Sequence, residues 1–145
     1  MTMGSIEQTF LLQVPSSTEN LALIRDFVTS VGEQSGLGEE DVSKLELAVD
    51  EACANAIEHA HGHDLTKAVT VRATFDEQSL RIEVVDAGSG FDLGAVADEP
   101  LDRLTATGRT GGLGVRVMRA LVDEVSYEIV PGEPNRLRLL KHIRR

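Results

Sequence analysis

The strongest helix signal in the chain covers residues 39–62 and begins with three consecutive acidic residues. The helix dipole favours negative charge at a helix start, and glycine, here Gly62, is common at a helix end. Apolar residues recur at intervals of three and four and form one stripe, which consists of Val42, Leu45, Val49, Ala52, Cys53, Ala56 and Ala60. We therefore expect a long helix with one buried side.

Strand and helix patterns lie on both sides of this helix in the sequence. The expected elements are, in order, a strand at 6–14, a helix at about 19–34, the helix at 39–62, strands at 67–75 and 80–87, a helix at 114–123, and strands at 124–130 and 136–143. Short polar turns join neighbouring strands into two hairpins. This order predicts a two-layer α/β (α+β) sandwich, with a mixed, mostly antiparallel sheet and helices on one face. No repeat or linker divides the chain, so we expect a single domain over residues 1–145.

The composition limits the kinds of partner. Of the 145 residues, 41% are hydrophobic and 26% are charged, which is typical of a globular domain and not of a disordered chain. Lys and Arg total 14 against 24 for Asp and Glu, which gives a net charge of −10. Such a surface repels nucleic-acid phosphates and anionic lipid, so neither nucleic acid nor a membrane is the expected partner. The negative charge suits a basic protein partner or serves solubility.

Cys53 is the single cysteine, so the chain has no internal disulfide and a reducing, intracellular location is expected. The N-terminal residues lack the basic region and apolar run of a signal peptide, and no apolar stretch is long enough to cross a membrane. The sequence thus predicts a cytoplasmic protein.

Three polar residues follow one another at four-residue spacing on the long helix: Glu51, Asn55 and His59. This spacing places them on one side of the helix, roughly opposite the apolar stripe. A solvent-exposed face is one interpretation. A pocket-lining face is the other, because apolar residues flank the polar ones, namely Leu47, Ala48 and Ala54. The spacing alone leaves both interpretations open.

The expected strand at 80–87 leads into the sequence DAGSGFD, in which Asp86 is followed by Gly88 and Gly90. Glycines at these positions permit the positive φ of a tight turn, and they also let a ligand approach the bare backbone. They do not form a dinucleotide-binding fingerprint, because Leu93 occupies the place of the third glycine. The chain also has no P-loop sequence.

A second glycine-rich segment, TGRTGGLGVRV at residues 107–117, runs into an apolar helix. Bare backbone N–H groups at a helix N-terminus form an anion site, which the helix dipole strengthens. A flexible linker accounts for the glycines equally well, but less well for Leu113 and the helix that follows at once. The two glycine-rich segments enclose a long irregular stretch, at about residues 88–112. Loops of that length in compact domains often act as lids over binding sites.

Taken in order, E-x-x-x-N on a helix, D-x-G-x-G after a strand and G-x-x-G-G-L-G opening a helix resemble the ATP-binding fold shared by histidine kinases, type II topoisomerases and MutL. The small size and the sequences VDEACANAIEHA and GGLGVRVMRALVDEVSYE are most similar to the anti-sigma factor serine kinases, the group of RsbW and SpoIIAB. The resemblance covers nearly the whole chain. It implies the Bergerat-type, histidine kinase-like ATPase fold, with an ATP lid over about residues 92–112.

The resemblance also implies a role for each motif residue. Asp86 would accept a hydrogen bond from the adenine amino group, which suits a carboxylate because it only accepts. Gly88 and Gly90 would let the backbone pass close to the nucleotide. Asn55 would bind Mg²⁺, and Glu51 would be the general base that takes the proton from a substrate serine. The phosphate contacts would come from Thr110, Gly111, Gly112, Leu113 and Gly114.

The function that the resemblance implies is that of a cytoplasmic serine protein kinase and anti-sigma factor that binds ATP or ADP. It would hold a sigma factor and phosphorylate a serine of a STAS-domain anti-anti-sigma partner, and the added charge would release that partner. The family also suggests a homodimer. Two alternatives remain: a nucleotide-binding module that sequesters a partner without phosphate transfer, and a switch kinase of the RsbT kind that acts on a STAS scaffold. Glu51 favours a kinase over a pure binding module, which would not need it.

Overall fold

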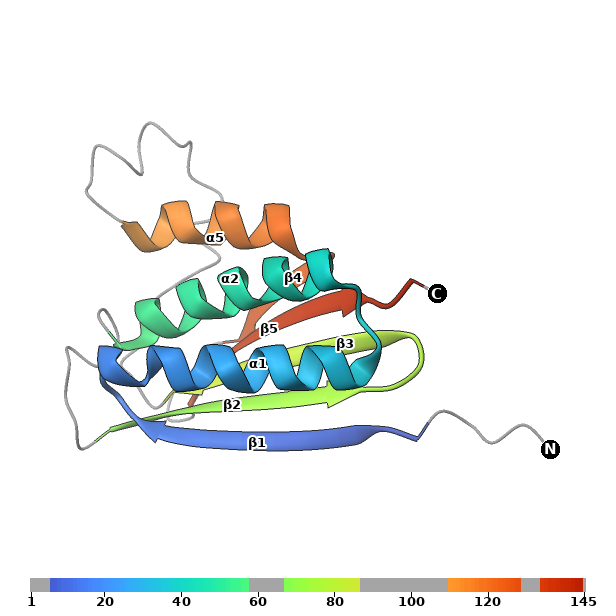
Figure 1. The fold of residues 1–145 in the computed structure, drawn as a ribbon. Coiled ribbons are helices and arrows are strands. Elements are labelled where there is room, and N and C mark those ends of the chain that lie inside the picture. Colours follow the sequence, from blue (N-terminus) through green and yellow to red (C-terminus); the bar gives the residue numbers. More distant parts are fainter. Residues whose placement is uncertain (1–5, 58–66, 87–109, 129–133, 145) are drawn as a thin grey trace.

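Five strands form one antiparallel sheet in the part of the chain that the structure, a computed structural model, describes: residues 6–57, 67–86, 110–128 and 134–144. Their order across the sheet is β1-β2-β3-β5-β4. The elements, in chain order, are β1 (Gln8–Pro15), the 3₁₀ helix η1 (Thr18–Asn20), α1 (Leu21–Ser35), α2 (Glu39–Asn55), β2 (Ala68–Phe75), β3 (Ser79–Asp86), α5 (Thr110–Leu121), β4 (Glu124–Glu128) and β5 (Asn135–His142). Helices α1 and α2 cover one face of the sheet, and α5 packs against α2 (Figure 1). The predicted two-layer α/β sandwich is confirmed.

Helices α1 and α2 approach each other closely at a glycine. A Cβ atom added to Gly32 would lie 3.0 Å from the nearest side-chain atom of Val42, so a larger residue would force the helices to shift. Helix α1 ends at Gly36, whose φ of 89° is one that glycine adopts without strain. The predicted helix at 19–34 is confirmed, with its first turn formed as the 3₁₀ helix η1.

The core lies between the helices and the sheet. The predicted stripe of α2 is buried over residues 42–56, and α1 adds Ile24, Val28 and Val31. The sheet contributes Val69, Val71, Ala73, Leu80, Ile82, Val84, Leu137 and Leu139. Ala48 was expected to flank the polar side of the helix, but it is fully buried. Since α2 packs against α1, α5 and the sheet at once, its buried arc is wider than one stripe.

The strand pairings of both predicted hairpins are present. Strands β2 and β3 are joined by a turn in which Asp76 Oδ1 accepts hydrogen bonds from the backbone N–H of Gln78 at 2.8 Å and of Ser79 at 3.0 Å. Strand β5 pairs with β4 on one side and with β3 on the other. Every pairing in the described part of the sheet is antiparallel, so the mixed sheet that the sequence suggested has no parallel pair there.

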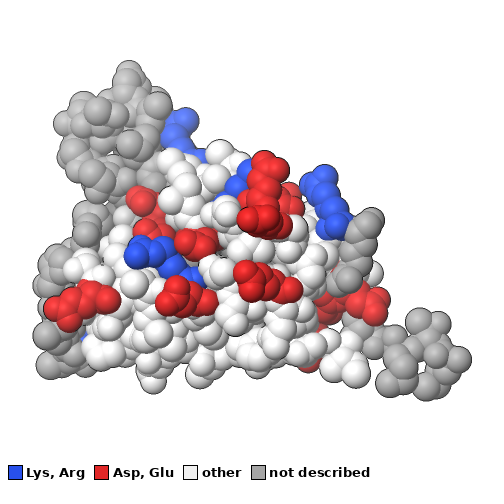
Figure 2. Space-filling model, in the orientation of Figure 1, with Lys and Arg blue, Asp and Glu red and all other residues white. Residues whose placement is uncertain are grey.

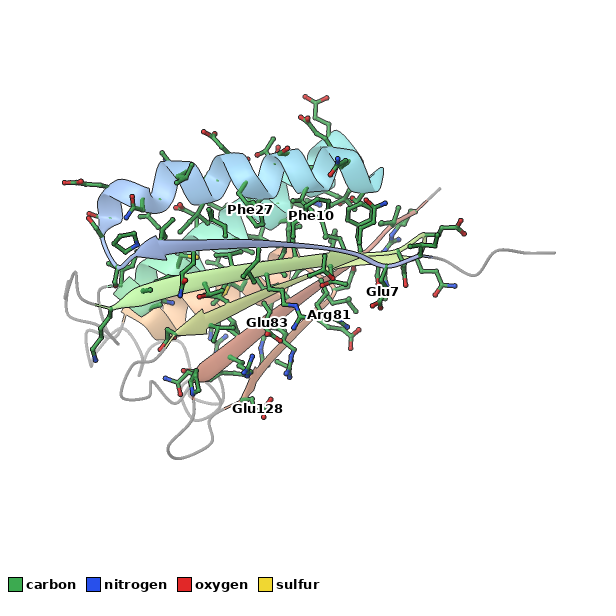
Figure 3. All side chains as sticks on the ribbon, turned by 90° about the horizontal axis from the view of Figure 1, so that it is seen from below. Glu7, Phe10, Phe27, Arg81, Glu83 and Glu128 are labelled. Carbon is green, nitrogen blue, oxygen red and sulfur yellow. The ribbon has the colours of Figure 1, made fainter. Side chains whose placement is uncertain are left out.

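The face of the sheet away from the helices carries a charged cluster. Glu83 Oε1 accepts a hydrogen bond from Arg136 Nη1 at 3.0 Å, and Glu83 Oε2 accepts one from Arg138 Nε at 2.8 Å. Figure 3 shows Glu83 and Arg81 on the side of the sheet opposite α1. A hollow of about 450 Å³ on this face is lined by Arg72, Thr74, Arg81, Glu83 and Arg138.

The charged cluster makes the stability of the fold depend on pH. Burial by itself raises the pKa of the Glu83 carboxyl, but the hydrogen bonds and charges of Arg138 and Arg136 outweigh burial and hold this pKa below its ordinary value of 4.5. A carboxyl whose pKa is lowered on folding stabilises the folded state above the ordinary pKa. That contribution is lost as the pH falls through the folded-state pKa.

We therefore expect Glu83→Gln to lower the free energy of unfolding by about 1–2 kcal/mol at neutral pH. The deficit relative to the wild type should shrink as the pH falls below 4.5, because the wild-type carboxyl then loses its charge as well. Urea unfolding at several pH values measures this difference. Glu124→Gln, at an exposed glutamate of β4, is the matched control. A deficit of Glu83→Gln that stays constant with pH would contradict the assigned ion pairs.

Two leucines of α2 test the assignment of the buried side. Leu45 is fully buried, whereas Leu47 is 54% exposed. We expect Leu45→Ala to lower the free energy of unfolding by about 2–5 kcal/mol because it leaves a cavity in the core. Leu47→Ala should change it by less than about 0.5 kcal/mol. Equal losses in urea unfolding of the two variants would show that α2 packs on a different side.

Candidate functional site

The predicted site residues that the structure describes gather at one end of the molecule. Helix α2 ends there at Asn55, strand β3 ends there at Asp86, and α5 begins there at Thr110 (Figure 1). The pairing of β3 with β5 places Asn135 opposite Asp86 at the same end. The fold thus brings three motifs that are far apart along the chain to one end of the sandwich.

Asn55 is the last residue of α2 and Glu51 lies one turn before it, and both are half-buried. The Nδ2 nitrogen of Asn55 is buried and has no hydrogen-bond partner within the described residues. A buried amide group without a hydrogen-bond partner costs free energy, so we expect this atom to bind a group outside the described residues, such as a ligand. After Asn55 the backbone continues through Ala56 and Ile57 as a π-helical turn, a feature that is frequent at functional sites. These observations favour a pocket-lining face over a solvent-exposed one.

Asp86 is the last residue of β3, and it is buried. Asn135, the first residue of β5, is 2% exposed, and its Nδ2 donates a hydrogen bond to Asp86 Oδ1 at 3.2 Å. The sequence patterns do not predict this partner, because residue 135 lies just outside the expected strand at 136–143. The register between β3 and β5 would have revealed it, but a sequence pattern does not indicate which distant strands pair.

The charge of Asp86 acts on helix α2. Burial is the main reason why the pKa of the Cys53 thiol is raised, and the negative charges of Asp50 and Asp86 raise this pKa further. Cys53 is fully buried and stays protonated, in agreement with its predicted place on the apolar stripe. Asp50, one residue before Glu51, is tied to α1 by a hydrogen bond of 2.9 Å from Arg25 Nη1. The carboxylates of Asp50 and Asp86 therefore both belong to the electrostatic surroundings of the C-terminal part of α2.

Helix α5 begins at Thr110, earlier than the start at residue 114 that the sequence predicted. The sequence placed the start too late because glycine has a low helix propensity and gives no apolar signal. In the structure, packing of α5 along α2 compensates for that low propensity. The predicted phosphate-binding residues therefore form the first turn of a helix: Thr110, Gly111, Gly112, Leu113 and Gly114. The N–H groups of a first turn have no partner within their own helix, which is the arrangement that binds anions.

Some predicted residues of the site lie outside the described residues. These are Gly88, Gly90 and His59, together with the part of the expected lid at 92–109. Their assignments stay predictions.

The described residues fit a magnesium–nucleotide complex. Asn55 offers an amide oxygen, a hard ligand that Mg²⁺ accepts together with phosphates and waters, and its Nδ2 lacks a partner in the described part of the chain. Asp86 offers an acceptor for an amino group, and the first turn of α5 offers N–H donors for phosphates. The hollow on the open sheet face has arginine side chains but contains none of the predicted site residues.

Comparison with known proteins identifies the family. A family described as the histidine kinase-like ATPase domain matches residues 14–141. The chain belongs to this family. It is 35% identical over 129 residues to the serine-protein kinase RsbW of Bacillus licheniformis, which covers 83% of this chain and 78% of the relative. It is 30% identical over 134 residues to the anti-sigma F factor of Caldanaerobacter subterraneus subsp. tengcongensis, which covers 92% of this chain and 93% of the relative. The resemblance to the anti-sigma factor kinases is therefore confirmed.

Two solved structures share the fold of this histidine kinase-like ATPase domain. The structure of the RsbU and RsbW domains of a Mycobacterium tuberculosis protein matches with a TM-score of 0.69 and 17% sequence identity, over 95% of this chain and 33% of that longer chain. The SiaB–SiaC complex of Pseudomonas aeruginosa matches with a TM-score of 0.65 and 15% identity, over 90% of this chain and 88% of that chain. At these identities the likeness concerns the fold alone.

Proposed function

We propose that this protein is an ATP-dependent serine protein kinase that also acts as an anti-sigma factor. The main support is the gathering of Glu51, Asn55, Asp86 and the first turn of α5 at one end of a domain that is 35% identical to an RsbW serine-protein kinase. The similarity to an anti-sigma F factor over nearly the whole chain supports the second activity.

Each element of the site has a part in nucleotide binding. Asp86 accepts a hydrogen bond from the adenine amino group, and the backbone N–H groups of residues 110–114 bind the phosphates. The side-chain oxygen of Asn55 would hold Mg²⁺, and the metal ion would neutralise charge on the phosphates. In this arrangement the adenine lies at the end of β3, and the phosphates lie between α2 and α5.

Glu51 carries the proton step of the proposed reaction. Its carboxylate takes the proton from a serine hydroxyl of the partner protein, and the serine oxygen forms a bond to the γ-phosphorus of ATP. The bond between that phosphorus and the β–γ bridging oxygen breaks, and the products are phosphoserine and ADP. The place of Glu51 on α2, one turn before Asn55, supports this role.

The proposed protein partners are a sigma factor and a STAS-domain anti-anti-sigma factor. Figure 2 shows acidic side chains spread over the face that carries the helices, and the chain has a net charge of −10. This charge suits a partner with a basic surface. A homodimer and a cytoplasmic location stay predictions. No helix in the described ranges is long and apolar enough to cross a membrane.

The kinase proposal is tested by incubating the protein with Mg·ATP and its STAS-domain partner. We expect phosphoserine on the partner, and we expect Glu51→Gln to slow its formation by a factor of about 10²–10⁴ while leaving ATP affinity within about threefold. Glu40→Gln, at an 85% exposed side chain near the start of α2, is the matched control and should be fully active. If both proteins bind and no phosphoserine forms, the protein is a sequestering module and not a kinase. Equal activity of Glu51→Gln would remove Glu51 from the mechanism.

Asp86→Asn should weaken ATP binding itself. In this variant the amide oxygen of residue 86 would accept the hydrogen bond from Asn135. The NH₂ group of the same amide would then face the adenine amino group, and two donors cannot form a hydrogen bond with each other. We expect ATP affinity to fall about 10- to 100-fold in a calorimetric titration. Asp26→Asn, which removes the same charge from an exposed position of α1, should leave the affinity unchanged. An unchanged affinity of Asp86→Asn would refute the adenine assignment.

A further inference from the structure

The strand pairing of the sheet brings the side chains of Asn135 and Asp86 together. The two residues face each other in the register of β3 and β5, and both are buried. Asn135 Nδ2 donates to Asp86 Oδ1 at 3.2 Å. Since the ladder fixes both backbones and burial excludes water, this hydrogen bond defines the local geometry and is not an incidental surface contact.

The chemistry of the two side chains fixes their orientation. An ionised carboxylate only accepts hydrogen bonds, so the amide of Asn135 must present its NH₂ group, and not its oxygen, to Asp86. The hydrogen bond to Oδ1 restrains rotation of the Asp86 carboxylate about its Cβ–Cγ bond, and it thereby restrains the direction in which Oδ2 accepts.

We propose that Asn135 is a positioning residue that determines the base selectivity of the nucleotide site. By holding the Asp86 carboxylate in one orientation, Asn135 makes this end of the pocket accept a purine with an amino group at C6 and reject one with a carbonyl oxygen there. A 6-oxo purine would place an acceptor against an acceptor. The inference rests on the proposed function, because it needs the adenine end of the nucleotide to lie at Asp86.

Two variants separate positioning from packing. Asn135→Ala removes the donor and lets the Asp86 carboxylate turn. Asn135→Asp keeps the shape of the side chain but puts a second carboxyl about 3.2 Å from the first, so that the two share a proton. Among the described residues, Val69 of β2 lies opposite Asp86 in the strand register, and the charges of Asp86 and Asp50 both act on Cys53 of α2.

The experiment measures by calorimetry the affinities of the wild type and of each variant for Mg·ATP and Mg·ITP, two nucleotides that differ at C6. The melting temperature of each protein without nucleotide is measured as well. The wild type should bind ATP at least about 30-fold more tightly than ITP. Asn135→Ala should reduce this ratio at least about fivefold, mainly through weaker ATP binding. Asn135→Asp should make ATP affinity depend on pH between about 5 and 8, which the wild type should not show. Asn20→Ala, which removes an amide that donates to Pro15 O at 2.8 Å, is the control and should leave the ratio unchanged.

The outcomes distinguish a role of Asn135 in base selectivity from nucleotide binding itself. If Asn135→Ala and Asn135→Asp lower the melting temperature but keep the ATP-to-ITP ratio and its pH dependence, Asn135 is only a structural residue and the inference is wrong. If the wild type binds ATP without preferring it to ITP, the inference is wrong while nucleotide binding stands. If the wild type binds neither nucleotide, the proposed function fails and the inference fails with it. Should Asn135→Ala not fold, the isosteric Asn135→Asp decides the question.

Discussion

The antiparallel ladder between β3 and β5 joins two strands that are separated along the chain by residues 87–134. Closing so long a segment costs conformational entropy, which is offset here by apolar burial between the strands and helices. The pairs Ile82↔Leu139 and Val84↔Leu137 belong to the core, while Glu83↔Arg138 lies on the open face. The same register places Asp86 opposite Asn135. A slip of one residue would move each of these side chains to the other face, so the core and the adenine end of the site depend on one register.

Helix α2 connects this sheet to the phosphate end of the site. At the end opposite the site, Lys141 of β5 is buried and lies 3.4 Å from Asp41 at the start of α2 and 3.9 Å from Asp123 just after α5. These contacts hold one end of each helix to the same strand. Helix α5 also packs directly along α2, which brings the first turn of α5 to the end of the molecule where α2 ends at Asn55.

The parts of this structure that sequence patterns predicted are the local ones. The periodicity of the helices and the short turn at Asp76 predicted elements that the structure contains, and the motif residues Glu51, Asn55 and Asp86 lie at one end of the fold. What the sequence missed depends on contacts between distant elements. Ala48 is buried because a third element packs on α2, and α5 begins at Thr110 because packing compensates for its glycines. Asn135 gained its place beside Asp86 only through the pairing of β3 with β5.

The most direct test of the account is a crystal structure of the protein with Mg²⁺ and a non-hydrolysable ATP analogue. The account predicts that the adenine amino group lies within hydrogen-bond distance of Asp86, that Asn55 holds the metal, and that the phosphates lie against the first turn of α5. A nucleotide bound in the arginine-lined hollow on the open face of the sheet, or an adenine turned away from Asp86, would contradict it.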